Sequence, residues 1–142
     1  GQRLVRRVAP KHDAYQSSPL ETQTIQSTIG HLLPQSREQV VPYAQDLGYK
    51  DLPLAGQQSY TLVRGRDTPQ SPRGYLGRAG LYEVMDVTEE IQNLIVKQAT
   101  SAEIQRMAVQ QGMITMRQDG YLKALSGITT LEEVNRVAAD TA

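Results

Sequence analysis

Apolar residues recur at helical intervals throughout the C-terminal part of the chain. Four short apolar stripes follow residue 86, each preceded by an Asp or Thr that has a Glu or Gln three positions later, the pattern of a capping box. The four pairs are Asp86 with Glu89, Thr100 with Glu103, Thr115 with Gln118, and Thr130 with Glu133. Short helices are marginal alone and must pack their stripes together. The pattern therefore predicts a small four-helix bundle over residues 86–142.

The faces of these helices follow from the same spacing. Gln105 falls on the polar side and is expected to be exposed. The residues predicted to be buried are Ile91, Leu94, Ile104, Met107, Leu122, Leu125, Leu131 and Val134.

The N-terminal part is less regular. Residues 2–8 resemble one amphipathic helical turn and a half, stopped by Pro10. Residues 20–33 carry an approximate helical stripe that ends at Pro34. A Ser36–Gln39 capping box predicts a further helix ending at Gly48, with Pro42 kinking it or marking its first turn.

Two short segments read as strands. Residues 59–64 are rich in β-forming residues, and residues 81–85 follow a Gly- and Pro-containing loop over 65–80. The two strands either pair as a hairpin or the second joins a sheet outside this chain. The fold class expected is α+β and mainly helical: N-terminal helices and a short two-strand β element, then the four-helix bundle. We expect a division into residues 1–85 and 86–142.

The composition excludes several classes of function. Fifteen basic and fifteen acidic residues cancel, so no global field attracts nucleic acid or anionic lipid. The absence of Cys removes thiolate chemistry and Cys-based zinc sites. No Gly is followed by Lys, so the phosphate-cradling Gly-x4-Gly-Lys-Ser/Thr loop is missing. We therefore expect no cofactor and no catalysis from this chain alone, and no residue spacing indicates a catalytic triad.

One rival interpretation is a helix-turn-helix over residues 101–125, with residues 115–125 as the DNA-recognition helix. That segment carries only Arg117 and Lys123 as cations against Asp119, and Gly120 weakens its middle. A DNA-binding helix needs a basic face, and this segment lacks one. The alternative function is still a DNA-binding module or, more generally, a helical interaction adaptor.

Three segments resemble one known family. They are Gln2-Arg3-Leu4-Val5-Arg6, Gly74-Tyr75-Leu76-Gly77-Arg78-Ala79-Gly80-Leu81-Tyr82-Glu83, and Gly127-Ile128-Thr129-Thr130-Leu131-Glu132-Glu133-Val134. Together they are similar to the C-terminal region of the ATPases of type II secretion and type IV pilus assembly. The resemblance is weakest over residues 13–60. It implies a non-catalytic region of a hexameric motor whose upstream RecA-like domain binds ATP and magnesium.

The resemblance also implies partners and a place in the cell. The partners are the upstream RecA-like domain, neighbouring subunits of the hexamer and an inner-membrane platform protein, with no nucleic acid. The location is cytoplasmic, peripheral to the inner membrane through the assembled machine. The chain begins at Gly1 rather than Met, and we interpret it as a piece of a longer protein.

The family often carries a four-cysteine zinc site, which this chain lacks. Ala9 and His12 stand at the first Cys pair, and Asp67 and Gln70 stand at the second. A structural zinc needs four ligands, so we expect no bound zinc and expect extra packing from residues 20–47 to secure the loop instead.

Arginines are the remaining candidates for a contact site. They cluster near the N-terminus and before the second expected strand, where the resemblance places contacts with a neighbouring subunit or the platform. The cluster comprises Arg3, Arg6, Arg7, Arg64, Arg66, Arg73 and Arg78. The candidate contact residues are Arg3, Arg6, Arg73 and Arg78.

Overall fold

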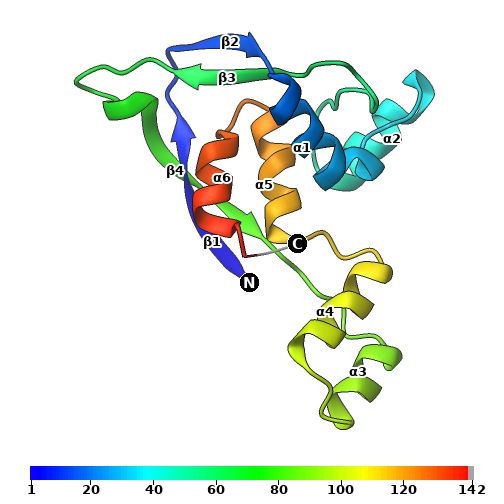
Figure 1. Cartoon of the computed structure of the whole chain (residues 1–142). Helices are drawn as coiled ribbons and strands as arrows, with labels where there is room; N and C mark the ends of the chain where they lie inside the picture. The colour runs from blue at the N-terminus through cyan, green and yellow to red at the C-terminus, as the bar shows by residue number, and fades with distance from the viewer. Residues whose placement is uncertain (141–142) are drawn as a thin grey trace.

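The structure is a computed structural model that describes residues 1–140. Its β structure consists of two antiparallel pairs of strands (Figure 1). β1 (Gln2–Val8) pairs with β4 (Tyr75–Tyr82), and β2 (His12–Gln16) pairs with β3 (Thr61–Gly65). Both pairs join segments that are far apart in the sequence. The fold is α+β and mainly helical, as expected.

The expected helix over residues 2–8 is wrong, because this segment is strand β1. A register shift between Arg6 and Val8 interrupts the pairing with β4. Val5 and Val8 are both buried, although strict alternation along a strand would place residues three apart on opposite faces. The irregularity gives buried residues at a spacing of three, which imitates a helical stripe.

The strand over 81–85 was also placed wrongly, since β4 covers residues 75–82 and its partner is β1, not the other expected strand. Its glycines indicated a loop, but each has a specific place in the strand. Gly77 has a φ of +80°, which favours glycine. A Cβ on Gly80 would lie 2.5 Å from the Tyr82 hydroxyl, so a larger residue there would displace the half-exposed Tyr82 side chain.

The N-terminal helices lie close to their predicted positions. α1 (Pro19–Ile29) begins at the Ser18 capping box and continues into the 3₁₀ turn η1 (Gly30–Leu32). α2 (Arg37–Leu47) contains Pro42 and ends at Gly48, whose φ is +83°. The predicted Ser36 capping box does not form: the Ser36 side chain accepts no cap hydrogen bond.

Four further helices complete the chain: α3 (Glu89–Val96), α4 (Ser101–Gln110), α5 (Met116–Leu125) and α6 (Leu131–Ala138). The Thr100 and Thr115 capping boxes form as predicted. Thr88, not Asp86, caps α3. Thr130 caps α6 by accepting the Glu133 N–H, while the Glu133 carboxylate binds elsewhere. A short 3₁₀ turn, η2 (Pro72–Gly74), precedes β4.

These helices do not form a four-helix bundle. α5 and α6 pack on each other, and with α1 and the strands they build the main core. That core includes Val5, Ile25, Leu81, Leu122 and Val134, so it draws on both sides of residue 85. α3 and α4 pack mainly against each other and project from the rest of the molecule (Figure 1). The division of the chain at residue 85 stays a prediction.

Of the residues predicted to be buried in the helices, Ile91, Leu122, Leu131 and Val134 are buried. The other four are only partly buried, and so is Gln105, which was expected to be exposed. Across residues 1–140, no helix has the length and apolar character needed to span a membrane.

Candidate functional site

The three sequence segments that carry the family resemblance meet around β1. The Gly-Tyr-x-Gly-Arg segment forms the end of η2 and strand β4, which lies along one edge of β1. The Gly-x-Thr-Thr segment connects α5 to α6 and lies along the other edge. There Val8 donates its N–H to the Ile128 carbonyl at 2.9 Å, and Thr129 Oγ1 donates to the Arg6 carbonyl at 2.8 Å. Both edges of β1 are therefore engaged within the chain.

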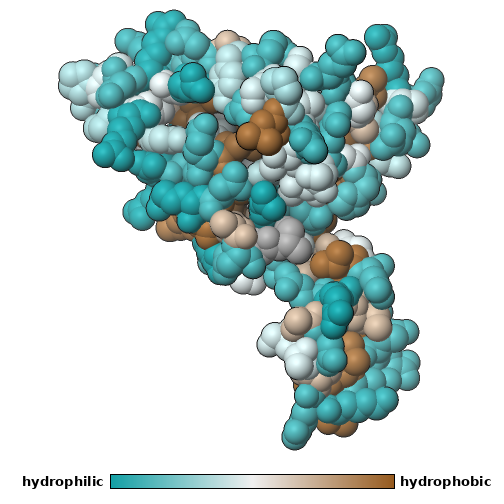
Figure 2. Space-filling model, viewed as in Figure 1, coloured by the Kyte–Doolittle hydropathy of each residue, from teal (hydrophilic) through white to brown (hydrophobic). Residues whose placement is uncertain are grey.

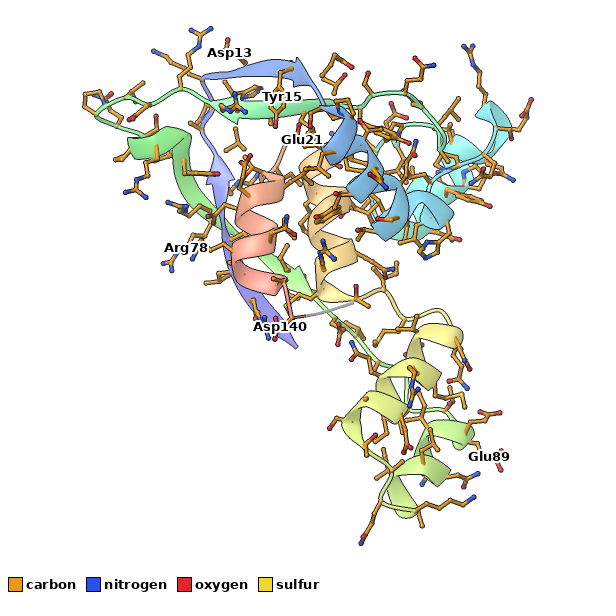
Figure 3. The ribbon with its side chains drawn as sticks, viewed as in Figure 1. Asp13, Tyr15, Glu21, Arg78, Glu89 and Asp140 are labelled. Atoms are coloured by element: carbon orange, nitrogen blue, oxygen red, sulfur yellow. The ribbon has the colours of Figure 1, made fainter. Side chains whose placement is uncertain are left out.

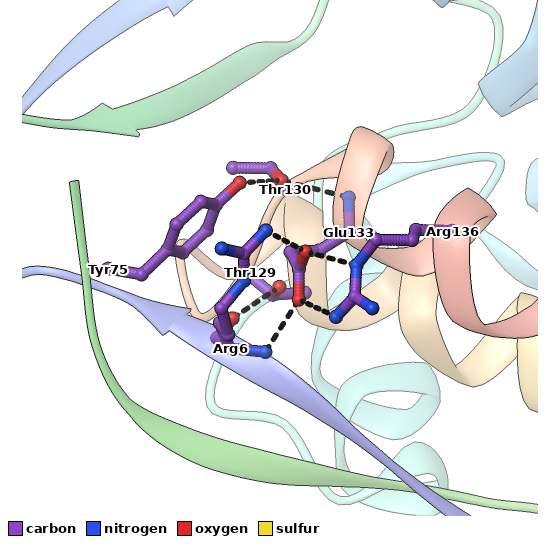
Figure 4. A network of polar contacts seen from close by, with 6 residues as sticks. All are labelled: Arg6, Tyr75, Thr129, Thr130, Glu133 and Arg136. Atoms are coloured by element: carbon purple, nitrogen blue, oxygen red, sulfur yellow. Dashed lines mark hydrogen bonds and ion pairs between the residues drawn. The ribbon is translucent and has the colours of Figure 1, made fainter. Parts of the chain in front are cut away.

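A buried carboxylate lies at the centre of this junction (Figure 4). Glu133 on α6 is 1% exposed. The Arg6 backbone N–H donates to its Oε2 at 2.8 Å, and Arg6 Nη2 donates to its Oε1 at 2.6 Å. Arg136 donates to the same two oxygens at 2.8 and 3.0 Å. One carboxylate thus accepts four hydrogen bonds from two arginines and joins α6 to β1.

Tyr75 completes the cluster from the β4 side. The Arg6 guanidinium carbon lies 4.4 Å from the centre of the Tyr75 ring, a cation–π geometry. The Tyr75 hydroxyl lies 2.7 Å from Thr130 Oγ1, the atom that caps α6. The conformation of η2 and β4 is therefore linked through two side chains to the start of the last helix.

The environment of Glu133 favours its ionised form. Burial by itself raises the pKa of this carboxyl, but the hydrogen bonds from Arg136 and Arg6 outweigh burial and lower the pKa to about 2. Two cations around one anion leave a local excess of one positive charge. The arrangement suits a structural ion-pair cluster and holds no general acid or base for neutral pH.

A second junction fixes the end of β4 against α5. Tyr82 donates its N–H to Asp119 Oδ2 at 2.9 Å, and Lys123 Nζ donates to the same oxygen at 2.6 Å. Glu83 Oε2 accepts the Met116 N–H at 3.0 Å, which satisfies a free donor at the start of α5. Burial and the Asp119 carboxylate raise the pKa of Tyr49, whose hydroxyl lies 3.4 Å from Asp119.

The structure separates the four candidate arginines into two groups. Arg3 donates to both carboxylate oxygens of Asp140, at 2.5 and 3.0 Å, and to the Val137 carbonyl. Arg6 binds Glu133 as described. Both therefore hold the C-terminal helix against β1. Arg73 and Arg78 are exposed, and their side chains have no hydrogen-bond or ion-pair partner within residues 1–140. Figure 3 shows Arg78 on the outer side of the β1–β4 pair.

The sequence pattern predicts Glu133 only as the capping-box partner of Thr130 and does not reveal its role as a buried ion-pair partner. Its position three residues after Thr130 matches a capping box, and that pattern conceals its actual partners. Tyr75 was noted only as part of a motif. The basic residues of β1 were the available signal, because a buried carboxylate requires cations nearby.

The turn at which the family resemblance implies a cysteine site is held by hydrogen bonds in this chain. Ala9 donates its N–H to the Gly74 carbonyl at 2.9 Å, and Asp67 Oδ1 accepts the Arg73 N–H at 3.1 Å. These bonds secure the turn, and a contribution from the packing of residues 20–47 stays a prediction. His12 Nδ1 lies 3.0 Å from the Ala9 carbonyl. Within the described part of the chain no group of three His, Cys, Asp or Glu side chains is suited to a metal. That the protein binds no zinc stays a prediction.

The helix-turn-helix interpretation is wrong. α5, the expected recognition helix, is packed between α1, α6 and the strands, and six of its ten residues are buried. Its surface is therefore not available to enter a DNA groove.

Comparison with known proteins identifies the family. The family model described as "Type II/IV secretion system protein" matches residues 1–136. The chain belongs to the type II/IV secretion system protein family. Type II secretion system protein E of Xanthomonas campestris is 43% identical over 79 residues, which are 56% of this chain and 14% of that protein.

Two pilus assembly ATPases show similar matches. Type IV pilus assembly ATPase PilB of Pseudomonas aeruginosa is 48% identical over 67 residues, 47% of this chain and 12% of that protein. PilB of Thermus thermophilus is 49% identical over 61 residues, 43% of this chain and 7% of that protein. The chain therefore spans a small fraction of the length of these relatives.

Proposed function

We propose that this chain is the C-terminal, non-catalytic region of a hexameric motor ATPase that powers type IV pilus assembly or type II protein secretion. The observation that carries the proposal is the family match over residues 1–136, together with relatives named as pilus assembly ATPases. The chain has no phosphate-binding loop. ATP and magnesium would therefore be bound by the RecA-like domain of the parent protein, upstream of this region.

The geometry suits a region that transmits movement. β1 is joined to β4 on one edge and to the α5–α6 connection on the other, and the Glu133 cluster fastens α6 to the same strand. A displacement of β1 would thus be carried to α6 without a flexible link between them. We infer that nucleotide-driven movement of the upstream domain reaches neighbouring subunits or the membrane platform through this unit. The parent protein would lie in the cytoplasm, at the inner membrane.

Arg73 and Arg78 are the arginines available for such contacts. Their side chains are exposed, whereas the Arg3 and Arg6 guanidinium groups are bound to Asp140 and Glu133. We propose Arg78, on the outer side of the sheet, and Arg73, in the turn before it, as contacts to a neighbouring subunit or the platform protein.

The test compares two Leu→Asp variants in the full-length parent protein. Leu122 is 1% exposed, so Leu122→Asp buries an unpaired charge and disrupts this region. Leu20 is 73% exposed, so Leu20→Asp is the matched control. We expect Leu122→Asp to abolish pilus or secretion output while ATP binding persists, and Leu20→Asp to preserve both. Normal output from a Leu122→Asp protein whose tail is digested by protease as an unfolded segment would remove this region from the mechanism.

A further inference from the structure

The projecting pair α3–α4 has a small core of its own. We call residues 88–113 the arm and the rest of the described chain, apart from residues 84–87 and 114, the body. In the arm, Ile91 is 0% exposed and Ala108 is 2% exposed. Neither residue belongs to the main hydrophobic cluster, which includes no residue between Leu81 and Met116. No shared apolar core therefore fixes the arm to the body.

Where the arm meets the body, the polar contacts lie within the body or within the arm. On the body side, Glu83 exchanges backbone hydrogen bonds with Gly1, and its carboxylate accepts the Met116 N–H. On the arm side, Thr88 Oγ1 lies 2.7 Å from Gln111 Oε1, and Gln111 Nε2 donates to Glu90. The two linkers between these fastened ends, residues 84–87 and residue 114, are short.

The first linker, residues 84–87, is held loosely, whereas Ile114, the second linker, is partly buried. Val84 is 74% exposed and Val87 is 62% exposed, so neither anchors its linker by packing. Gly112 has a φ of +98°, and a Cβ placed there would meet no atom within 4 Å. Open space surrounds the point at which the second connection leaves α4.

Clefts at the junction leave room for movement. One, of 380 Å³, is lined by Leu47, Tyr82 and Leu122 from the body and by Ala108 and Gly112 from the arm. Another, of 390 Å³, is lined by Gly1 and Glu83 from the body and by Ser101, Ile104 and Gln105 from the arm. Figure 2 shows the narrow waist where the arm leaves the body, and hydrophobic side chains on the arm surface.

We infer that the arm is a rigid unit that swings on a two-stranded hinge formed by residues 84–87 and 114, while the body stays fixed. Motions of this kind take roughly microseconds to milliseconds. The hinge belongs to the chain itself and does not depend on the proposed motor function, so each can fail without the other. In an assembled machine it would let the arm change orientation without disturbing the Glu133 cluster.

Residual dipolar couplings of the 142-residue chain test both parts of the inference. Amide couplings from α3 and α4 should fit one alignment tensor, and those from α1, α5 and α6 should fit another of larger magnitude. A single tensor that fits all five helices would overturn the hinge. Couplings of α3 and α4 that fit no common tensor would overturn the rigid arm.

Spin-label distances give an independent measurement. The chain has no Cys, so labels attach only at introduced positions. Gln23→Cys on α1 with Gln92→Cys on α3 spans the hinge, and Gln23→Cys with Glu132→Cys on α6 lies within the body; all three residues are exposed. We expect a broader distance distribution for the first pair than for the second. Equal widths would contradict the hinge.

Discussion

Arg6 and Glu133 lie 127 positions apart in the sequence and are joined by two hydrogen bonds, of 2.8 Å from the Arg6 backbone and 2.6 Å from its guanidinium. The backbone bond satisfies an N–H on the edge of β1, and the side-chain bond neutralises a buried charge. The contact therefore fixes the C-terminal helix to the first strand through both the main chain and a charge pair. Three predictions concern this contact and the turn beside it.

Glu133→Gln should destabilise the protein by about 3 kcal/mol, the lower end of the cost of breaking a buried ion pair. The lower end applies because Arg6 and Arg136 stay partly exposed, at 38% and 57% of their side chains, so water can solvate them. The neighbouring Glu132 is exposed, and Glu132→Gln is the matched control, expected within about 0.5 kcal/mol of the parent chain. Urea unfolding measures both, and equal effects would show that the Glu133 cluster contributes nothing.

The same carboxylate predicts how stability depends on pH. The folded-state pKa of Glu133 is about 2, below its ordinary value of 4.5. The folded state therefore binds this proton less readily than the unfolded state, so the stabilisation is fully present above the ordinary value. It should be lost as the pH falls from 4.5 toward 2.

The unfolding free energies of the unsubstituted 142-residue chain and of the Glu133→Gln chain are measured across this pH range. Their difference isolates the contribution of the Glu133 carboxylate. Hydrogen bonds with Arg66 and Arg3 also lower the pKa of Asp13 and Asp140, but both variants share those groups. The difference in stability between the two chains should shrink on acidification. A difference that stays constant with pH would contradict the pKa assignment.

Gly74→Ala should be more costly than a positive φ alone explains. Gly74 has a φ of +85°, and a Cβ there would lie 2.3 Å from the Gly65 carbonyl oxygen. Gly56 has a φ of +73° and open space around it, so Gly56→Ala isolates the backbone strain, about 1–2 kcal/mol. Thermal unfolding should rank Gly74→Ala clearly below Gly56→Ala. Equal melting temperatures would mean that the two glycines need not approach each other.

Ile91→Ala should destabilise the arm and leave the stability of the body unchanged. The substitution removes a fully buried side chain, a change that costs about 2–5 kcal/mol. Ile95 on the same helix is 47% exposed, so Ile95→Ala is the matched control. Hydrogen exchange should accelerate in α3 and α4 of the Ile91→Ala protein and stay unchanged in α1, α5 and α6. Faster exchange throughout the chain would show that arm and body unfold as one unit.

Local signals predicted the helices better than the strands. Thr100 and Thr115 mark helix starts correctly because a capping box uses residues within one turn. β1 was mistaken for a helix because its partner β4 lies more than 60 residues away and an irregular register imitates helical spacing. β2 carries mostly polar, exposed residues, so its sequence gives no alternation to recognise.

The packing of the helices also differs from the prediction. Four similar stripes suggested one bundle, but the stripe of a helix does not name its partner. α5 is buried by α6, by α1 near the start of the chain and by strands β3 and β4 in its middle. α3 and α4 are left to pack on each other. Arg6 was predicted as a candidate contact to a partner, and its partner within the chain, Glu133, was not predicted.

Titration with Mg-ATP tests most directly the claim that this chain is a motor region without a nucleotide site. Isothermal calorimetry should show no binding heat for the 142-residue chain at millimolar nucleotide, because the chain lacks the Gly-x4-Gly-Lys-Ser/Thr phosphate-binding loop. The full-length parent protein, titrated in parallel, should bind. Micromolar affinity of the isolated chain for Mg-ATP would contradict the account, and so would a parent protein that binds no nucleotide.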